Sequence, residues 1–237
     1  MTASVETPPL FPRLDLRSWQ GVALALLACL ILAVLAFVIF QPIQVLPRMR
    51  LAPGFALIDQ DGRPLTNEDL RGQFVLYNFT YSRCQPPDCG NYDQIMREVQ
   101  QRMGEIDLRG QRLALVTISV DAAHDTPAVL QRYAQGLEAD AAVWQFASAA
   151  PERLKQIVGG GFEVFYEAEG EEVQLSPTMI LVDGWGIVRA VYHMRTTPPE
   201  TERILRHVEL LAVEVAQSKG VARLGYEAAH LFLCYAS

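Results

Sequence analysis

The pattern of apolar and polar positions divides the chain into one long apolar segment and a longer mixed segment after it. Residues 19–40 read WQGVALALLACLILAVLAFVIF and carry no charge. A helix rises ~1.5 Å per residue, so about 20 such residues cross the ~30 Å hydrocarbon core of a bilayer. The segment therefore predicts a transmembrane helix. Because the apolar run continues to Gln41, without the shorter core and cleavage site of a signal peptide, we expect an uncleaved anchor.

From residue 53 onward, short apolar runs alternate with segments of helical periodicity, and there is no internal repeat. Residues 55–66 predict a hairpin that turns at Asp61-Gly62, and residues 73–82 and 113–120 predict buried strands, the second covered on both faces. Further predicted elements are helices at 91–103, 151–158 and 198–217, a helix opened by Asp125-Thr126-Pro127, and strands at 143–147, 179–182 and 186–192. Strands and helices in this order predict an α/β fold, a three-layer sandwich.

The expected organisation places one folded domain behind the anchor. Residues 1–18 form an N-terminal tail, 19–40 the anchor, 41–52 a linker, 53–217 the domain and 218–237 a C-terminal tail. About 165 residues suffice for a single domain with a substantial core. The linker is rich in proline and predicts a partly extended spacer that lifts the domain off the membrane. The tail predicts a short amphipathic helix that packs on the domain, lies at the membrane surface or binds a partner.

The charge of the chain argues against one class of partner but does not determine its orientation in the membrane. The formal net charge is −7 and no run of Lys or Arg occurs. Nucleic acid is therefore not an expected partner, because such binding depends on neutralising phosphates. Arg13 and Arg17 precede the anchor while Arg48 and Arg50 follow it, so the positive-inside count is tied. Because nearly all of the folded mass follows a short tail, we expect the domain on the periplasmic or exoplasmic side.

Two cysteines follow the first long buried strand. Cys84 and Cys89 lie between a predicted strand and a predicted helix, where unpaired amides and the helix dipole favour the thiolate. Thiolates are both nucleophiles and metal ligands, so the pair predicts redox or metal chemistry. Arg83 favours and Asp88 opposes the neighbouring thiolate, which makes Cys84 the expected attacking thiol. An inert structural disulfide between the same residues is the alternative in an oxidising compartment.

Over residues 53–217 the sequence resembles the Sco/SenC family of thioredoxin-fold proteins. The segments that carry the resemblance are FTYSRC with its second cysteine, SVDAAHDTPAVLQRYA and LSPTMILVDGWGIVRAVY. The resemblance implies a thioredoxin-like three-layer sandwich in which Cys84 and Cys89 bind copper together with a histidine before a late strand. It also implies work on the binuclear copper centre of cytochrome c oxidase, by copper delivery or, as in some members, by thiol-disulfide reduction.

The chain departs from the family pattern at two positions. Four residues separate Cys84 from Cys89, where the family has three, but a turn can still bring two Cα atoms within the ~4.4–6.8 Å of a disulfide. The position of the copper-binding histidine lines up with Leu175, and leucine cannot ligate a metal. We therefore expect the two thiolates to hold Cu(I), a soft ion that suits sulfur, and to hold Cu(II) much more weakly.

Other residues near the predicted site have open roles. Ser176-Pro177-Thr178 resembles the segment in which thioredoxin-like proteins often carry a cis-proline against the active cysteines, and the isomer is not readable from the sequence. Asp121 and Asp125 either order the loop beside the thiols or serve as cap and turn residues. None of the four histidines is expected to replace the missing ligand. His193 ends a late strand, and the others are His124, His207 and His230.

The resulting hypothesis is a membrane-anchored Sco-like protein that serves assembly of the copper centre of a respiratory oxidase. Cys84 and Cys89 would alternate between dithiol, disulfide and Cu(I)-bound forms. The expected partners are the membrane, through residues 19–40, and an oxidase subunit or another copper or thiol protein. One alternative is a dedicated thiol-disulfide reductase that never carries copper. The other is a non-catalytic, membrane-tethered subunit of a respiratory complex with a structural disulfide.

Overall fold

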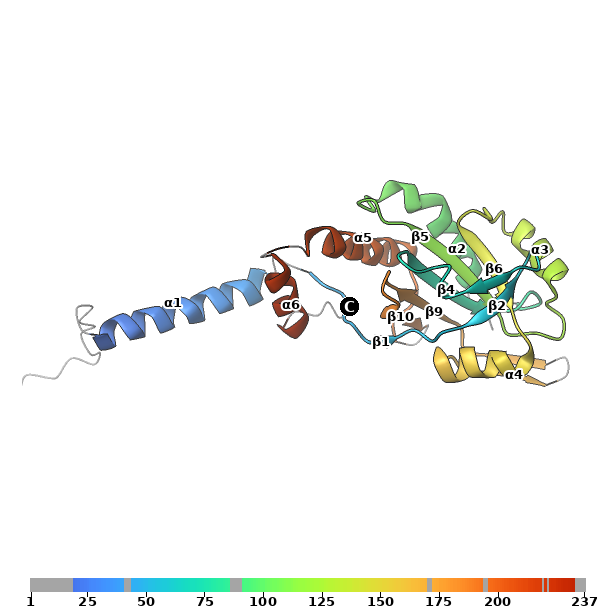
Figure 1. Ribbon diagram of the computed structural model, residues 1–237, viewed down its shortest axis with the longest axis horizontal. Helices are drawn as coiled ribbons and strands as arrows, with labels where there is room; N and C mark the ends of the chain where they lie inside the picture. The colour runs from blue at the N-terminus through green and yellow to red at the C-terminus, as the bar shows by residue number, and fades with distance from the viewer. Residues whose placement is uncertain are drawn as a thin grey trace, which may run out of the picture. The chain divides into compact units, whose positions relative to one another are not determined.

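A computed structural model describes residues 19–40, 44–85, 91–169, 172–193, 196–218, 220 and 222–232. The chain separates into two units, residues 1–43 and residues 44–237. The first unit contains helix α1, Trp19–Phe40, and the second contains the sheet and the remaining helices (Figure 1). Within the described part of the chain, α1 is the one helix long and apolar enough to cross a bilayer, so it is a candidate membrane span.

The described residues of the second unit form a mixed sheet of eight strands (Figure 1). In spatial order the strands are β1 (Arg50–Leu51), β10 (Ile187–His193), β9 (Thr178–Val182), β4 (Phe74–Thr80), β5 (Leu113–Ser119), β6 (Trp144–Ser148), β2 (Ala56–Asp59) and β3 (Pro64–Thr66). Strands β4, β5 and β6 run parallel at the centre, and β9 is antiparallel to β4. Every residue of β4 and β5 is buried, as expected for strands covered on both faces.

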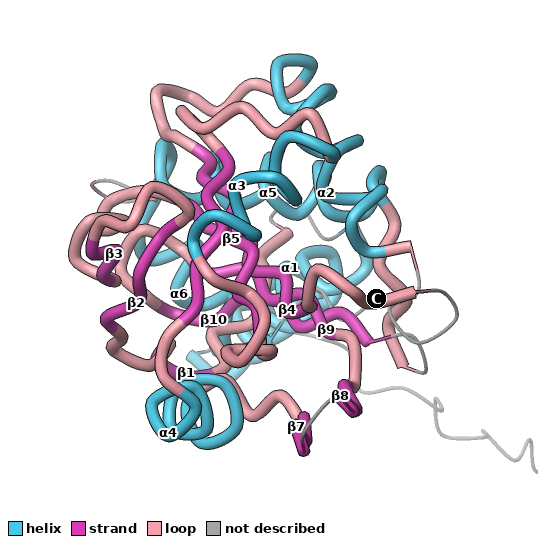
Figure 2. Tube along the Cα trace, turned by 90° about the vertical axis from the view of Figure 1, so that its right-hand side faces the viewer, coloured by secondary structure: helices cyan, strands magenta, loops and turns pink. Residues whose placement is uncertain are grey.

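Helices cover both faces of the sheet. These are α2 (Tyr92–Arg102) with the short η1 (Met103–Glu105), α3 (Pro127–Gly136), α4 (Pro151–Leu154) continued by the π-helical η2 (Lys155–Gly161), α5 (Thr201–Gln217) and α6 (Ala222–Phe232). Figure 1 shows α4 on the opposite side of the sheet from α2 and α5. A separate hairpin, β7 (Tyr166–Glu169) and β8 (Glu172–Leu175), lies apart from the main sheet on the side of α4 (Figure 2).

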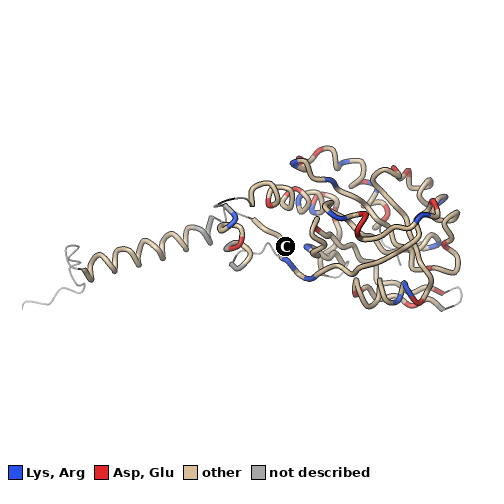
Figure 3. The backbone as a smooth tube through the Cα atoms, viewed as in Figure 1, with Lys and Arg blue, Asp and Glu red and all other residues tan. Residues whose placement is uncertain are grey.

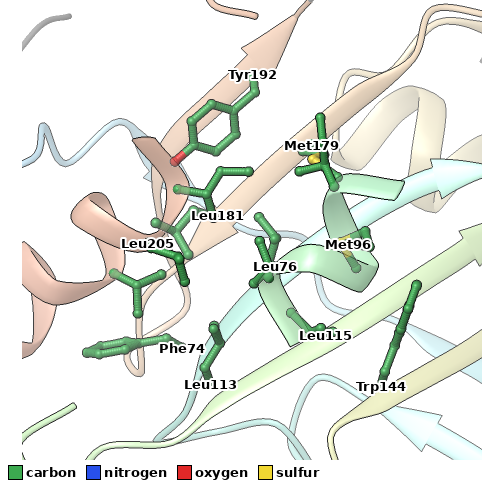
Figure 4. Close-up of a cluster of buried hydrophobic side chains, with 14 of the residues drawn as sticks. Phe74, Leu76, Met96, Leu113, Leu115, Trp144, Met179, Leu181, Tyr192 and Leu205 are labelled. Carbon is green, nitrogen blue, oxygen red and sulfur yellow. The ribbon is translucent and has the colours of Figure 1, made fainter. Parts of the chain in front are cut away.

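Two apolar clusters form the core, one on each face of the sheet. Alternate residues of β4 supply both, because successive strand side chains point to opposite faces: Leu76 joins one cluster, and Val75 and Tyr77 join the other. Figure 4 shows the first cluster, in which Leu76 gathers with Met96 of α2 and Leu205 of α5. The three-layer α/β sandwich predicted from the sequence is confirmed.

The segment after the anchor differs from the predicted spacer. Val45 and Leu46 are buried, the amide of Met49 donates to the carbonyl of Val188 at 3.0 Å, and Arg50–Leu51 pairs with β10. Burying an aliphatic side chain contributes about 1.5–3 kcal/mol, and pairing also satisfies the backbone groups at the edge of β10. From residue 44 onward, the segment that was expected to be a partly extended spacer is therefore part of the folded domain.

A buried ionic cluster joins this segment to the sheet and to α5. The guanidinium of Arg189, 1 % exposed, contacts the carboxylates of Asp183 at 3.0 Å and Glu214 at 2.6 Å. It also donates to the carbonyl oxygens of Leu46 and Pro47. Both carboxylates are themselves buried, and the cluster was not anticipated from the sequence.

The expected C-terminal helix is present as α6, and it packs on the domain. Tyr226 and Ala229 are buried, and the Tyr226 hydroxyl donates to the side chain of Gln217 at 2.7 Å. His230 Nε2 lies 2.9 Å from Glu214 Oε1, so α6 also contacts the Arg189 cluster. Figure 3 shows basic and acidic residues interspersed over the second unit and none in α1, consistent with the absence of any basic run in the sequence.

Candidate functional site

Cys84 lies in a tight turn four residues beyond the end of β4. Its amide donates to the carbonyl of Tyr81 at 3.0 Å, and its sulfur is engaged in a disulfide bond. The second predicted site residue, Cys89, falls outside the described residues. Pairing of Cys84 with Cys89 therefore stays a prediction.

The carboxylate of Asp125 holds this turn against the loop that follows β5. Asp125 is 2 % exposed and accepts hydrogen bonds from the amide of Ser82, at 2.8 Å, and from the Ser82 hydroxyl. It also accepts one from the hydroxyl of Ser119, at the end of β5. Because β4 and β5 are parallel neighbours, their carboxyl ends meet at one edge of the sheet, and Asp125 fastens the two together there. Of the two roles that the sequence left open, loop ordering is the one that these contacts support.

A second carboxylate, Asp121, binds the residue next to the thiol. The Arg83 guanidinium donates to Asp121 at 2.8 and 3.3 Å, and His124 Nδ1 lies 2.9 Å from the same carboxyl group. Burial alone would raise the pKa of Asp121, but the hydrogen bonds from Arg83 and His124 outweigh it and lower that pKa below its usual range. The positive charge expected to favour the Cys84 thiolate is therefore largely offset by Asp121, which reduces the assistance that Arg83 gives.

Leu175, which the sequence resemblance was expected to align with the family's copper-binding histidine, is an apolar packing residue. Leu175 ends β8, is half-buried and packs against the core cluster on the α4 side of the sheet. The same hairpin contacts the thiol turn, because the Tyr81 hydroxyl donates to the carbonyl of Val173 at 3.3 Å. The Tyr92 hydroxyl donates to the carbonyl of Pro177 at 3.0 Å, which joins the start of α2 to the segment before β9.

The histidines have structural partners. His193 Nδ1 lies 3.0 Å from the hydroxyl of Thr178, and burial lowers the pKa of His193. His207 is buried in the core beside the Tyr192 hydroxyl at 2.7 Å, and burial lowers its pKa to about 4. His124 and His230 contact carboxylates, as described above. In the part of the chain that the structure describes, no three His, Cys, Asp or Glu side chains cluster as a metal site.

This donor set fits one oxidation state of copper better than the other. Reduction of the disulfide would make Cys84 available as a thiolate, and sulfur ligands suit Cu(I) at low coordination number. Cu(II) favours nitrogen or oxygen ligands in a tetragonal arrangement, and the side chain of Leu175 offers neither. The residues therefore fit Cu(I) bound through cysteine sulfur.

β4 carries a buried polar side chain, Asn78, that was not anticipated from the sequence. Asn78 donates to Asp93 Oδ1 at 3.0 Å, and the Tyr133 hydroxyl donates to Asp93 Oδ2. Burial raises the pKa of Asp93, against the opposing effect of both hydrogen bonds. The one signal in the sequence was an asparagine in the middle of an otherwise apolar strand.

Comparison with known proteins agrees with this fold. The SCO1/SenC family matches residues 44–209. A candidate copper-binding protein of Stutzerimonas stutzeri is 30% identical over 152 residues, which cover 63% of this chain and 72% of that protein. Copper-bound ScoI of Arabidopsis thaliana has a TM-score of 0.56 at 21% identity, covering 67% of this chain and 98% of ScoI.

A further solved structure is BsSco, described as a member of the Sco family of cytochrome c oxidase assembly proteins in which a disulfide switch was identified. Its TM-score is 0.60 at 21% identity, covering 70% of this chain and 96% of BsSco. These two structural likenesses show the shared fold, and the family match extends over more than half of the sequence. The chain belongs to the SCO1/SenC family.

Proposed function

We propose that this protein serves assembly of the copper centre of a respiratory oxidase, with Cys84 and Cys89 as its working thiols. The observation that carries the proposal is the position of Cys84, in a turn held by Asp125 at the carboxyl edge of a SCO1/SenC sheet. The copper-binding description of the Stutzerimonas stutzeri relative and the assembly role given for BsSco's family support it.

The membrane arrangement is part of the same proposal. Helix α1 would anchor the protein, and the second unit would work on the periplasmic or exoplasmic side. Its partner there would be an oxidase subunit or another protein with cysteines that bind copper. The disulfide at Cys84 is consistent with an oxidising compartment.

The thiol pair would carry out two related reactions. In the first, the reduced pair loses two protons, binds Cu(I) through two thiolates and passes the ion to a target by ligand exchange. In the second, the dithiol reduces a disulfide in the target. Two electrons and two protons then pass to the target, and a disulfide forms between Cys84 and Cys89. Asp125 would hold Cys84 in place in both reactions.

A dedicated thiol-disulfide reductase is the second candidate, and two observations favour it. Leu175, which the resemblance aligns with the family's metal ligand, packs against the apolar core, and Cys84 is in the disulfide form. A reductase needs both thiols and no imidazole. A non-catalytic subunit with an inert disulfide is the remaining alternative.

Anaerobic Cu(I) titration of the reduced full-length chain in detergent separates these functions. The chain would carry Cys29→Ser and Cys234→Ser, so that Cys84 and Cys89 are the thiols that remain, and a competing chelator would set the free Cu(I) concentration. We expect one Cu(I) per chain, and no competitive binding after the further changes Cys84→Ser and Cys89→Ser. Equal binding with and without the pair would overturn copper delivery through these cysteines.

Thiol exchange is measured separately on the same protein. Equilibration with glutathione buffers gives the reduction potential of the pair. A potential in the range of thiol oxidoreductases, without Cu(I) binding, would establish the reductase. A bond that resists reduction by glutathione would instead support the structural subunit.

A further inference from the structure

Trp185 lies at the surface of the domain, in a fixed turn between β9 and β10. Its side chain is 64 % exposed. The amides of Trp185 and Ile187 both donate to Asp183 Oδ1 at 3.0 Å, and Asp183 is itself buried and paired with Arg189. Gly186 completes the turn at a φ of 82°, which glycine adopts without strain. The turn therefore holds a large aromatic side chain in contact with solvent.

Apolar and basic side chains lie beside Trp185. Leu51, 72 % exposed, and Arg71 line the same pocket as Trp185. Arg112 follows Gln111, which lines a second hollow beside Trp185. Arg112 is exposed, and its guanidinium forms no ion pair with any described residue. We call Leu51, Arg71, Arg112 and Trp185 the basal patch. Tryptophan, aliphatic and basic side chains together are the combination that membrane–water interfaces favour.

The basal patch and the thiol turn lie at opposite ends of β4. The amide of Gly72, two residues before β4 begins, donates to the carbonyl of Gly184 at 3.0 Å, next to Trp185. Cys84 instead follows the other end of the strand. The seven residues of β4 rise ~3.3 Å each, so ~20 Å of strand separates the two ends.

The chain enters the domain at the same end as the basal patch. Arg48 lies just before β1 and pairs with Glu214 of α5 at 3.5 Å. Val215, the residue after Glu214, lines the second hollow together with Trp185. The entering segment and the basal patch therefore both adjoin the carboxyl-terminal turns of α5.

Chain length keeps this entrance close to the end of the anchor. α1 ends at Phe40, and the described part of the second unit begins at Gln44, four Cα–Cα steps later. At 3.8 Å for each step, the two residues can lie at most ~15 Å apart. Val45 and Leu46 are already buried in the domain, so the chain adds no free length after Gln44. A bilayer that holds α1 is therefore a surface within reach of this end of the domain.

We propose that the basal patch docks on the surface of the bilayer that holds α1. Trp185 and Leu51 enter the interfacial layer, and the guanidinium groups of Arg71 and Arg112 contact lipid phosphates. The inference goes beyond the proposed function and rests on its membrane arrangement. Because the chain has a net charge of −7, attraction to anionic lipid depends on these local charges. Docking in this way turns the edge that carries Cys84 away from the membrane, where the soluble part of a target can reach it.

The test measures where Trp185 lies when the full-length chain is inserted in lipid nanodiscs. The discs contain equal parts of phosphatidylcholine and phosphatidylglycerol, with or without bromine on the acyl chains, and Trp19→Phe removes the tryptophan of α1. Trp144 is buried in the core, so the difference between this chain and the same chain with Trp185→Phe gives the emission of Trp185. We expect bromine to quench most of this emission and dissolved iodide to quench little of it.

A tryptophan near the thiol turn is the matched control. Phe165 is 57 % exposed and directly precedes β7, whose partner strand β8 contacts the turn through the hydrogen bond from Tyr81 to Val173. Phe165→Trp in the chain with Trp19→Phe and Trp185→Phe moves the reporter there. Iodide should quench this emission, and bromine should leave it unchanged.

Lipid charge tests the basic residues of the patch. Arg71→Gln with Arg112→Gln should lower the bromine quenching of Trp185 in the anionic discs and change it little in discs of phosphatidylcholine alone. Arg132 of α3 is also exposed but lies outside the basal patch. Arg132→Gln is therefore the control, and it should leave the quenching unchanged in both kinds of disc.

Three results would contradict this account in different ways. Quenching of Trp185 by iodide and not by bromine, in discs that carry the chain, would overturn the proposal. Equal bromine quenching at positions 165 and 185 would also overturn it, because the domain would then contact lipid without preference for the basal patch. A chain that does not co-elute with the discs would refute the membrane arrangement itself. The assay contains neither copper nor a target, so it does not depend on the role of the thiols.

Discussion

The backbone amide and the hydroxyl of Ser82 both donate hydrogen bonds to the carboxylate of Asp125. Ser82 precedes Cys84 by two residues, and Asp125 lies in the loop between β5 and α3. The turn that presents the thiol is therefore held by a residue 43 positions away in the sequence. Both partners belong to the carboxyl edge of the parallel strands, where a fixed backbone can place a reactive side chain.

Removing the Asp125 carboxylate is expected to loosen this turn. Asp125→Ala would leave the amide and hydroxyl of Ser82 and the hydroxyl of Ser119 without their acceptor, at a cost of about 2–4 kcal/mol in the free energy of unfolding. Urea denaturation measures the loss, and the same variant should bind Cu(I) more weakly. Asp125→Asn keeps one acceptor oxygen and should lose less. A difference below about 0.5 kcal/mol for Asp125→Ala would contradict this account.

The buried guanidinium of Arg189 is expected to be critical for stability. Arg189→Met would leave the carboxylates of Asp183 and Glu214 buried without their cation, which typically costs about 3–5 kcal/mol. The matched control is Arg71→Met, because Arg71 pairs with Glu68 at the exposed surface and such pairs contribute about 0–1 kcal/mol. Urea unfolding of both variants gives the comparison, and equal losses would rule out the special role of the cluster.

Acid is expected to destabilise the protein through His207 and then through Glu214. The pKa of His207 is about 4 in the folded state, below its usual 6.5, so its contribution is present above pH 6.5 and is lost as the pH falls toward 4. Burial opposes ionisation of Glu214, but Arg189 and His230 lower its pKa below 4.5, so its contribution is lost at still lower pH. His207→Asn should flatten the stability profile between about pH 6.5 and 4. Urea unfolding at several pH values gives the free energy of unfolding. If this free energy depends on pH as steeply in the variant as in the parent, His207 does not titrate in this way.

Restoring an imidazole at position 175 is expected to change the preference for copper. Leu175→His would add a nitrogen donor at the position that the resemblance aligns with the family's histidine, and Cu(II) affinity should rise at least about tenfold. Competition against a Cu(II) chelator and visible absorption measure the change. Gln174→His is the control, because Gln174 is exposed on the opposite face of β8. Equal gains from both variants would place the family's ligand position elsewhere.

Elements with a local signal could be predicted from the amino-acid pattern. The uninterrupted apolar run of α1, the hairpin turn with Gly62 at a φ of 76°, and the start of α3 at Pro127 all match their predictions. The strand before Cys84, β4, also matches its prediction. In each of these, a hydrophobic period, a turn residue or a proline acts within a few residues of the structure that it specifies.

The contacts between side chains from different elements could not be predicted in this way. Arg83 was expected to assist Cys84, yet it binds Asp121, 38 positions away. Asn78 of β4 and Tyr133 of α3 both donate hydrogen bonds to Asp93 of α2. Leu46 is buried in the core, although its segment was expected to be a spacer. Sequence periodicity reports how much of an element is buried, but the identity of the buried partner depends on strand order and on helix packing across the sheet. Those depend on contacts between residues far apart in the chain, which no local pattern encodes.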